Sequence, residues 1–279
     1  MKIEFFCPRW GAEQLPWPEF LQQVQDAGYA GIEWFPYGEQ CDHDEVIALL
    51  QAKGLKWCIV TAVINMPAGF DAYLQELRKQ LTSLAAMGKG VWPPLFISTQ
   101  TGREYFTEEQ TGRCLEVCRE VSLGTGIAIH QETHRNKWSY AAHVVKPILE
   151  KFPDTLLTFD ISHWFCVSES YLEDQQPAVQ MAITHARHIH ARVGHKEGPQ
   201  VYEPSSPEYA DALKAHLAVW DEYIKQRREA GATSCTITPE FGPPPYLVFA
   251  NRSGTPQQEQ WRVNLWMKNF LQLRYSNNH

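Results

Sequence analysis

The chain has 279 residues, of which 44% are hydrophobic and 20% charged, enough apolar material for a large core. A formal net charge of -7 without a basic tract argues against nucleic acid or an anionic membrane as the main partner. No apolar run is long enough to cross a membrane, and the N-terminus enters a strand-like segment at once, without a signal peptide. We therefore expect a cytoplasmic protein that acts on a small molecule, and homo-oligomerisation stays open.

Cysteine usage points to a reducing environment. The chain has 7 cysteines, an odd number. Cys7, Cys58 and Cys235 lie inside apolar strand-like runs, and Cys114 and Cys118 would share one face of a helix. Cysteines in such positions behave as small buried apolar residues, so we expect free reduced thiols and no disulfide framework.

Strand-like and helix-like segments alternate along the whole chain, with no low-complexity linker between them. Short apolar runs rich in β-branched or aromatic residues predict strands. Eight such runs occur, at residues 3–7, 31–35, 55–61, 95–98, 127–132, 156–160, 188–193 and 234–240.

Helical patterns occupy the intervals between these strands. The clearest one covers residues 70–87, with Gly88 as its C-terminal stop. A second begins at Thr107, which forms a capping box with Gln110. Two more are predicted at residues 207–230, where Gly231 ends the helix, and at residues 258–274.

The alternation of strands and helices implies a parallel sheet with helices outside it. Eight such units predict one domain over residues 1–279, a closed (β/α)8 TIM barrel whose active site gathers at the C-terminal strand ends. An open doubly wound sheet is the main alternative, but it usually carries a glycine-rich phosphate loop after its first strand. Here the first strand runs into Pro8, Arg9 and Trp10, which form no such loop.

Acidic or imidazole side chains end four consecutive predicted strands, at Glu132, Asp160, His190 and Glu240. Any one of them alone is more often a helix cap or a salt-bridge partner. Four of them at one edge of a sheet would converge, and a buried charge there needs a partner. Three carboxylates and one imidazole suit a single divalent cation, with Mn2+ preferred and Mg2+, Co2+ or Zn2+ also open.

These residues resemble the xylose-isomerase-like superfamily, and more narrowly its sugar (phosphate) isomerase/epimerase branch. The resemblance covers essentially the whole chain. Its most specific motifs are the Asp-x-x-His step at Asp160 and His163 and the His-x-His of the seventh strand at His188 and His190. It implies that the four strand-end residues bind one divalent metal, often manganese, and that His163 contacts a substrate oxygen.

The chain also departs from relatives of this kind. Endonuclease IV has a similar fold but uses additional histidines on strands three and four, which have none here. Ketose epimerases of the branch commonly have a substrate-binding Glu where this chain has Trp138, and an Arg where it has Lys196. The substrate is therefore expected to differ from the free ketohexoses of that group.

The expected chemistry is proton transfer through an enediolate that the cation stabilises, with Glu132 and Glu240 as the catalytic pair. Return of the proton to the neighbouring carbon gives isomerisation, and return from the opposite Glu gives epimerisation. A metal-dependent dehydratase of an inosose- or dehydroshikimate-like substrate is the alternative. A third hypothesis is a non-catalytic barrel that binds a sugar or a metal. It predicts that one of the metal-ligating residues or a catalytic Glu is missing, whereas all of them are present in the sequence.

Further side chains near the strand ends are candidates for substrate binding. Arg135, Arg192 and Lys196 could hold a substrate carboxylate or phosphate, or pair with neighbouring acids. Glu33 could reach the pocket or pair inside the barrel, and His188 is expected chiefly as a hydrogen-bonded interior residue. The predicted substrate-binding set is Trp10, Trp138, His163, His188, Arg192 and Lys196.

Overall fold

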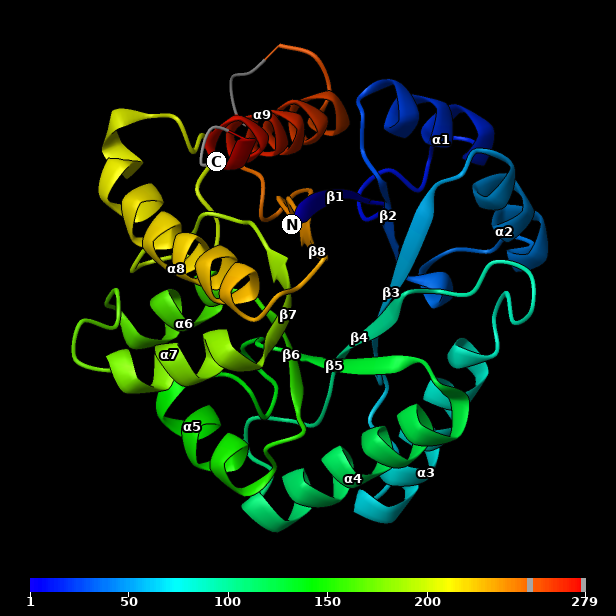
Figure 1. Cartoon of the computed structure of the whole chain (residues 1–279), viewed down its shortest axis with the longest axis vertical. Helices are drawn as coiled ribbons and strands as arrows, with labels where there is room; N and C mark the ends of the chain where they lie inside the picture. The colour runs from blue at the N-terminus through cyan, green and yellow to red at the C-terminus, as the bar shows by residue number, and fades with distance from the viewer. Residues whose placement is uncertain (250–252, 277–279) are drawn as a thin grey trace.

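The computed structural model describes residues 1–249 and 253–276, and in it eight parallel strands close into a barrel (Figure 1). The strands are paired in chain order, and β1 also pairs with β8 in a register that joins Lys2 to Ser234 and Phe5 to Ile237. This closure confirms the predicted TIM barrel and excludes an open sheet. The strands are β1 Lys2–Pro8, β2 Gly31–Trp34, β3 Lys56–Ala62, β4 Phe96–Gln100, β5 Ala128–Glu132, β6 Leu156–Phe159, β7 Ala186–His190 and β8 Ser234–Thr238.

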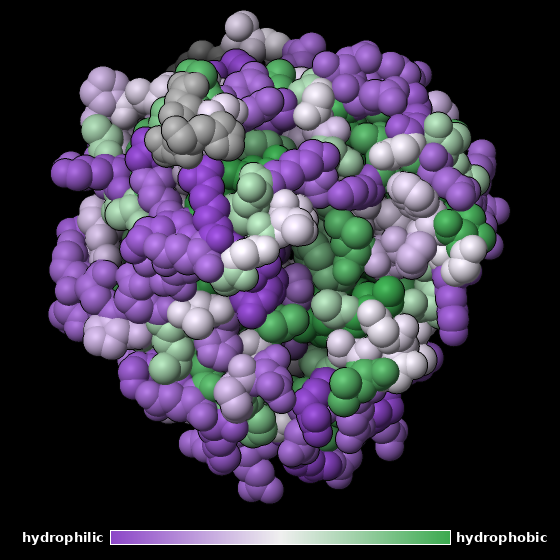
Figure 2. All heavy atoms as spheres, in the orientation of Figure 1, coloured by the Kyte–Doolittle hydropathy of each residue, from purple (hydrophilic) through white to green (hydrophobic). Residues whose placement is uncertain are grey.

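Helices surround the barrel on its outside (Figure 1). They are α1 Trp17–Asp26, α2 His43–Ala52, α3 Phe70–Ala85, α4 Glu108–Thr125, α5 Ala142–Lys151, α6 Ile161–Ser168, α7 Gln176–His185, α8 Ala210–Glu229 and α9 Pro256–Ser276, with 3-10 turns η1 Pro36–Gly38 and η2 Pro207–Tyr209. The predicted capping box at Thr107 and Gln110 is present. Charged and polar residues cover the outer faces of the ring in Figure 2, and apolar ones lie mainly toward its middle.

Four predicted strands run past the point where the structure ends them. β2 ends at Trp34, one residue earlier than predicted. β6 ends at Phe159 because Asp160 already caps α6, its side chain accepting a hydrogen bond from the backbone N–H of Ser162. β8 ends at Thr238 because Pro239 has no N–H to continue the ladder. β7 ends at His190. Asp160 is therefore the single residue between β6 and α6, and Glu240 is the second residue after β8, so both still lie at the C-terminal rim.

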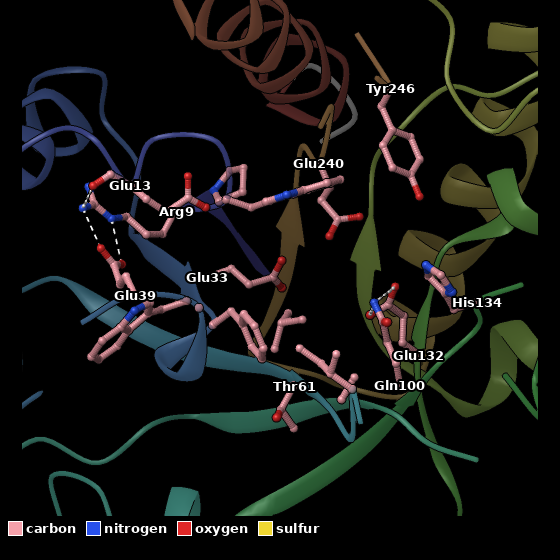
Figure 3. Close-up of a pocket in the computed structure, with 18 of the residues that line it drawn as sticks. Arg9, Glu13, Glu33, Glu39, Thr61, Gln100, Glu132, His134, Glu240 and Tyr246 are labelled. Carbon is pink, nitrogen blue, oxygen red and sulfur yellow. Dashed lines mark hydrogen bonds and ion pairs between the residues drawn. The ribbon is translucent and has the colours of Figure 1, made fainter. Parts of the chain in front are cut away.

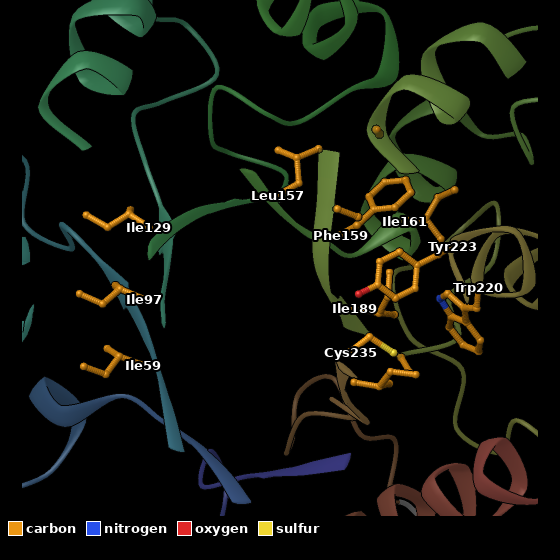
Figure 4. Close-up of a cluster of buried hydrophobic side chains, with 14 of the residues drawn as sticks. Ile59, Ile97, Ile129, Leu157, Phe159, Ile161, Ile189, Trp220, Tyr223 and Cys235 are labelled. Atoms are coloured by element: carbon orange, nitrogen blue, oxygen red, sulfur yellow. The ribbon is translucent and has the colours of Figure 1, made fainter. Parts of the chain in front are cut away.

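Alternation of side chains along each strand separates two cores. One set points outward and packs under the helices, as Ile59, Ile97, Ile189 and Cys235 do in Figure 4. The other set points into the barrel, where Phe96 stacks on His130 with ring centroids 4.3 Å apart. The site residues continue this inward set toward the C-terminal rim. All seven cysteines are free thiols, as expected.

Candidate metal centre

A cavity of about 300 Å³ opens at the C-terminal ends of the strands (Figure 3). Its wall from β1 to β3 includes the apolar residues Pro8, Trp34, Phe35, Val60, Ala62 and Ile64 and the charged residues Arg9, Glu13, Glu33 and Glu39. Its wall from β4 to β8 is polar and includes Gln100, Glu132, His134, Arg192, Glu240 and Tyr246. The cavity therefore offers apolar surface for a carbon skeleton on one side only, and polar groups on both.

Three of the four predicted metal ligands come together at this cavity. Glu132, His190 and Glu240 each offer one ligand atom, and these atoms lie within 4.8 Å of one another. Nδ1 of His190 is 3.1 Å from Oε2 of Glu240 and 3.8 Å from Oε1 of Glu132. This Nδ1 is buried and faces both carboxylates within ion-pair distance, but it makes no hydrogen bond of good geometry.

The other ring nitrogen of His190 is held by Glu33, which crosses the barrel from β2. Nε2 lies 3.0 Å from Oε2 of Glu33. A carboxylate at this position favours the hydrogen on Nε2 and leaves the lone pair on Nδ1, the arrangement that metal-binding histidines usually have. The sequence left open whether Glu33 reaches the pocket or pairs inside the barrel. In the structure it does both, because it lines the cavity and pairs with buried histidines.

The pKa values of Glu132 and His190 depend on burial and on the charges around them. Burial raises the pKa of Glu132 to about 8, opposed by His190 and reinforced by the charges of Glu240 and Asp160. Burial alone would lower the pKa of His190, yet the carboxylates of Glu240, Glu33 and Glu132 raise it well above its ordinary value. Closely spaced carboxylates around one imidazole are a donor set that fits a divalent cation, which would replace the protons they share.

Asp160, the fourth predicted ligand, is engaged elsewhere. Its Oδ2 accepts a hydrogen bond from Nη2 of Arg192 at 2.5 Å, and its Oδ1 accepts from the backbone N–H and hydroxyl of Ser162 at 2.9 and 2.5 Å. The residue is fully buried and anchors both Arg192 and the start of α6. The structure therefore assembles three of the predicted ligands into one cluster and gives Asp160 a guanidinium as its partner.

The predicted substrate-binding residues divide between the cavity and its surroundings. Trp10 and Arg192 line the cavity. His188 is buried beneath it, bonded to Thr236 and Thr238 as expected of an interior residue. His163 is fully buried behind the cavity wall.

Two residues chosen by their spacing from family motifs lie outside the cavity lining. Trp138 is buried on the outer side of β5, where its Nε1–H donates to Gln131. Lys196 places its Nζ over the ring of Tyr171, 4.8 Å from the centroid. Neither contact directs the side chain at Glu132, His190 or Glu240.

Gln100 and Tyr246 are two of the lining residues that the sequence did not predict. Nε2 of Gln100 donates to both carboxylate oxygens of Glu132, at 3.2 and 3.1 Å, and so orients that carboxylate. Its position at the end of β4, in phase with inward-facing Phe96, was the available signal. Tyr246 follows a run of prolines after β8, and no periodic pattern marks it.

No family model matches the sequence, and no curated protein matches it. Solved structures do match. The probable 3-DHS dehydratase AsbF of petrobactin synthesis, from Bacillus anthracis, shares 18% identity with a TM-score of 0.61, over 97% of this chain and 99% of that chain. The 3-keto-D-glucoside 4-epimerase YcjR from E. coli shares 12% identity with a TM-score of 0.63, over 96% and 100%.

A third match is a xylose isomerase-like TIM barrel protein from Mycobacterium smegmatis, solved in complex with magnesium. It shares 12% identity with a TM-score of 0.56, over 96% of this chain and 97% of that chain. These matches confirm the xylose-isomerase-like resemblance, and at such identities they do so for the fold alone. In the described part of the chain, no helix combines the length and the apolar character needed to span a membrane.

Proposed function

We propose that this protein is a divalent-metal-dependent isomerase or epimerase that moves a proton on a small sugar or hydroxy-keto compound. The observation that carries the proposal is that Glu132 and Glu240 both lie beside Nδ1 of His190 at one small cavity (Figure 3). Two carboxylates at one substrate-sized cavity can remove a proton from carbon and return one. Similarity of fold to an epimerase supports this choice of chemistry.

Glu132, His190 and Glu240 would hold the cation. Asp160 would join them if the hydrogen bond from Nη2 of Arg192 to Oδ2 of Asp160 were broken. When bound, the ion would polarise the substrate carbonyl and offset the negative charge that develops on its oxygens. Mn2+ remains the preferred ion, because carboxylates favour a hard cation and an imidazole tolerates a transition metal. Nδ1 of His190 supports this assignment, because it faces two carboxylates without a hydrogen bond of good geometry to either.

The protein's own residues then orient and move the proton. Gln100 fixes the plane of the Glu132 carboxylate by donating to both of its oxygens. Glu240 lies on the neighbouring wall next to Tyr246 and Arg192, so it approaches a substrate from a different direction (Figure 3). Proton transfer by one carboxylate to an adjacent carbon isomerises a sugar, and transfer from the other to the same carbon epimerises it.

The test is incubation with ketoses, aldoses and keto-inositols in D2O with added Mn2+, followed by NMR. We expect metal-dependent incorporation of solvent deuterium at the carbon that receives the proton. Glu13→Gln is a control for the loss of a carboxylate from this cavity and should keep the metal-dependent exchange. Glu13 lines the same cavity, but within the described residues its carboxylate accepts only from the backbone N–H of Gly11. Product without deuterium, or turnover that is unaffected by chelation, would contradict the proposal.

Dehydration is the second candidate, favoured by the similarity of fold to a dehydratase and by His134 at the cavity wall. It needs a general acid that faces the leaving hydroxyl. Burial lowers the pKa of His134 to about 3, so this imidazole carries no extra proton at neutral pH and is a poor acid. Appearance of an unsaturated product in the same NMR panel would favour the dehydratase.

A further inference from the structure

His163 lies between two guanidinium groups that cannot both bond to it. Its Nδ1 is 2.8 Å from Nη1 of Arg135, and its Nε2 is 2.8 Å from Nη2 of Arg192. A neutral imidazole has one N–H and one acceptor nitrogen, whereas a guanidinium only donates. One of the two contacts is therefore a hydrogen bond and the other brings N–H against N–H, whichever tautomer His163 adopts.

The surroundings of the two arginines show which contact is the hydrogen bond. Arg192 is 2% exposed and is fixed by Asp160 at 2.5 Å and by the hydroxyl of Ser162 at 3.3 Å. Arg135 is only partly buried on the loop after β5, and its other side-chain bond is to a phenol, from Nη2 to the hydroxyl of Tyr246 at 2.9 Å. Arg192 thus keeps the acceptor nitrogen of His163, and Nη1 of Arg135 is left facing an N–H.

Arg135 also has no carboxylate partner among the residues that the structure describes. The nearby acid, Asp160, is already paired with Arg192. The Tyr246 hydroxyl accepts from Arg135, so its own hydrogen is free to donate, and Tyr246 lines the cavity (Figure 3). The guanidinium carbons of Arg135 and Arg192 lie 5.4 and 5.3 Å from the ring centroid of Tyr246. Two cations and one free hydroxyl donor therefore meet at this end of the cavity, where the two acids, Asp160 and Glu240, both face Arg192 and neither pairs with Arg135.

We propose that Arg135 and Tyr246 form an anion-binding subsite, so that the substrate is a sugar or hydroxy-keto compound bearing a carboxylate or phosphate group. The inference rests on the proposed function for the rest of the substrate. Turning Nη1 of Arg135 from His163 toward the cavity gives up no hydrogen bond, and an anion there gains a charge-assisted one. An anion is placed here because the guanidinium of Arg135 has no acid of its own among the described residues. Glu240 also lies at this part of the wall, but its Oε2 faces Nη1 of Arg192 at 3.8 Å.

The experiment compares three ketoses that differ only at C6: D-fructose, D-fructuronate and D-fructose 6-phosphate. Binding is measured by calorimetry on Mn2+-loaded and metal-free protein, for the wild type, Arg135→Gln and Tyr246→Phe. Arg113→Gln is the control, since Arg113 is exposed and pairs with Asp71 away from the barrel mouth. Tyr246→Phe keeps the ring and removes only the hydroxyl, so it serves if Arg135→Gln is unstable.

We expect the wild type to bind one charged ketose about tenfold or more tightly than fructose, a difference typical of a charge-assisted contact. Arg135→Gln should abolish this preference and leave fructose affinity within about twofold, while Arg113→Gln changes neither. The preferred ketose distinguishes carboxylate from phosphate. Equal binding of all three by the wild type, or an equal loss for all three in Arg135→Gln, overturns the subsite.

The subsite and the proposed function fail in different measurements. If the charged ketoses show no metal-dependent deuterium exchange but still bind through Arg135, the isomerase proposal falls and the subsite stands. If exchange occurs with equal efficiency on neutral and charged ketoses, the subsite falls and the isomerase stands.

Discussion

Replacement of Glu33 by glutamine tests how His190 is prepared to bind a cation. The two side chains have nearly the same shape, so the change removes a charge without opening a cavity. Oε2 of Glu33 faces four donors: Nε2 of His190 at 3.0 Å, Nε2 of His188 at 3.3 Å, the hydroxyl of Thr238 at 3.4 Å and the thiol of Cys58 at 3.8 Å. His190 and His188 hold the pKa of Glu33 well below its usual range, although burial alone would raise it.

The magnitude follows from these contacts. A hydrogen bond to a charged group contributes about 1.5–3 kcal/mol to stability. Removing the outer partner of a metal-binding histidine typically weakens metal affinity about 10–100 fold, or roughly 1.4–2.7 kcal/mol. We therefore expect Glu33→Gln to bind Mn2+ about 10–100 fold more weakly, and the metal-free variant to lose about 1–3 kcal/mol of unfolding free energy.

Calorimetric titration with Mn2+ and urea unfolding of the chelated protein measure the two quantities separately. Glu13→Gln again serves as the control, because it removes a carboxylate from the same cavity without touching His190. Unchanged Mn2+ affinity in Glu33→Gln would refute the reasoning, since Nδ1 would then be presented equally well without the Glu33 bond.

Three further predictions follow from the site and from the buried histidines. Glu240→Gln should keep the fold and lose turnover on the order of 10²–10⁴ fold. A product that carries no solvent deuterium would indicate a hydride shift and would exclude Glu132 and Glu240 as the proton-transfer pair. Adding Mn2+ at a hundredfold excess over its Kd to chelated protein should stabilise it by about 2.7 kcal/mol, which raises the melting temperature by about 5 °C, and no shift would contradict the metal site. Burial lowers the pKa of His216 to about 4 against its ordinary 6.5, so the unfolded chain binds more protons between these pH values and stability falls as pH drops through them. His216→Gln should reduce the slope of unfolding free energy against pH by up to about 1.4 kcal/mol per pH unit in that window, and an unchanged slope would contradict the assignment.

The fold was predictable because each strand and helix carries its own local pattern. Glu132 and Glu240 could be chosen for the same reason, since parallel strands in a barrel present their C-terminal ends to one rim. The pairing of Asp160 with Arg192 could not be deduced, because each residue had a plausible separate role and their contact depends on how two loops pack. Trp138 and Lys196 show the same limit, since spacing from a motif does not determine the direction in which a loop turns.

The hydrogen bond between Glu33 and His190 could not be predicted from the sequence, for another reason. A Glu inside an apolar strand indicates a buried partner without saying which one. Its partner, His190, is 157 residues further along the chain. Only the closure of the barrel, with its particular strand stagger, brings β2 opposite β7.

This same separation has a consequence for how the protein is made. Glu33 leaves the ribosome early, whereas His190 and Glu240 come from the last third of the chain, and β1 cannot find its partner β8 until synthesis is nearly complete. Pairings between segments so distant in sequence form slowly and late. A nascent or truncated chain therefore exposes isolated acids with no complete site, and only a finished molecule brings Glu33, His190 and Glu240 together.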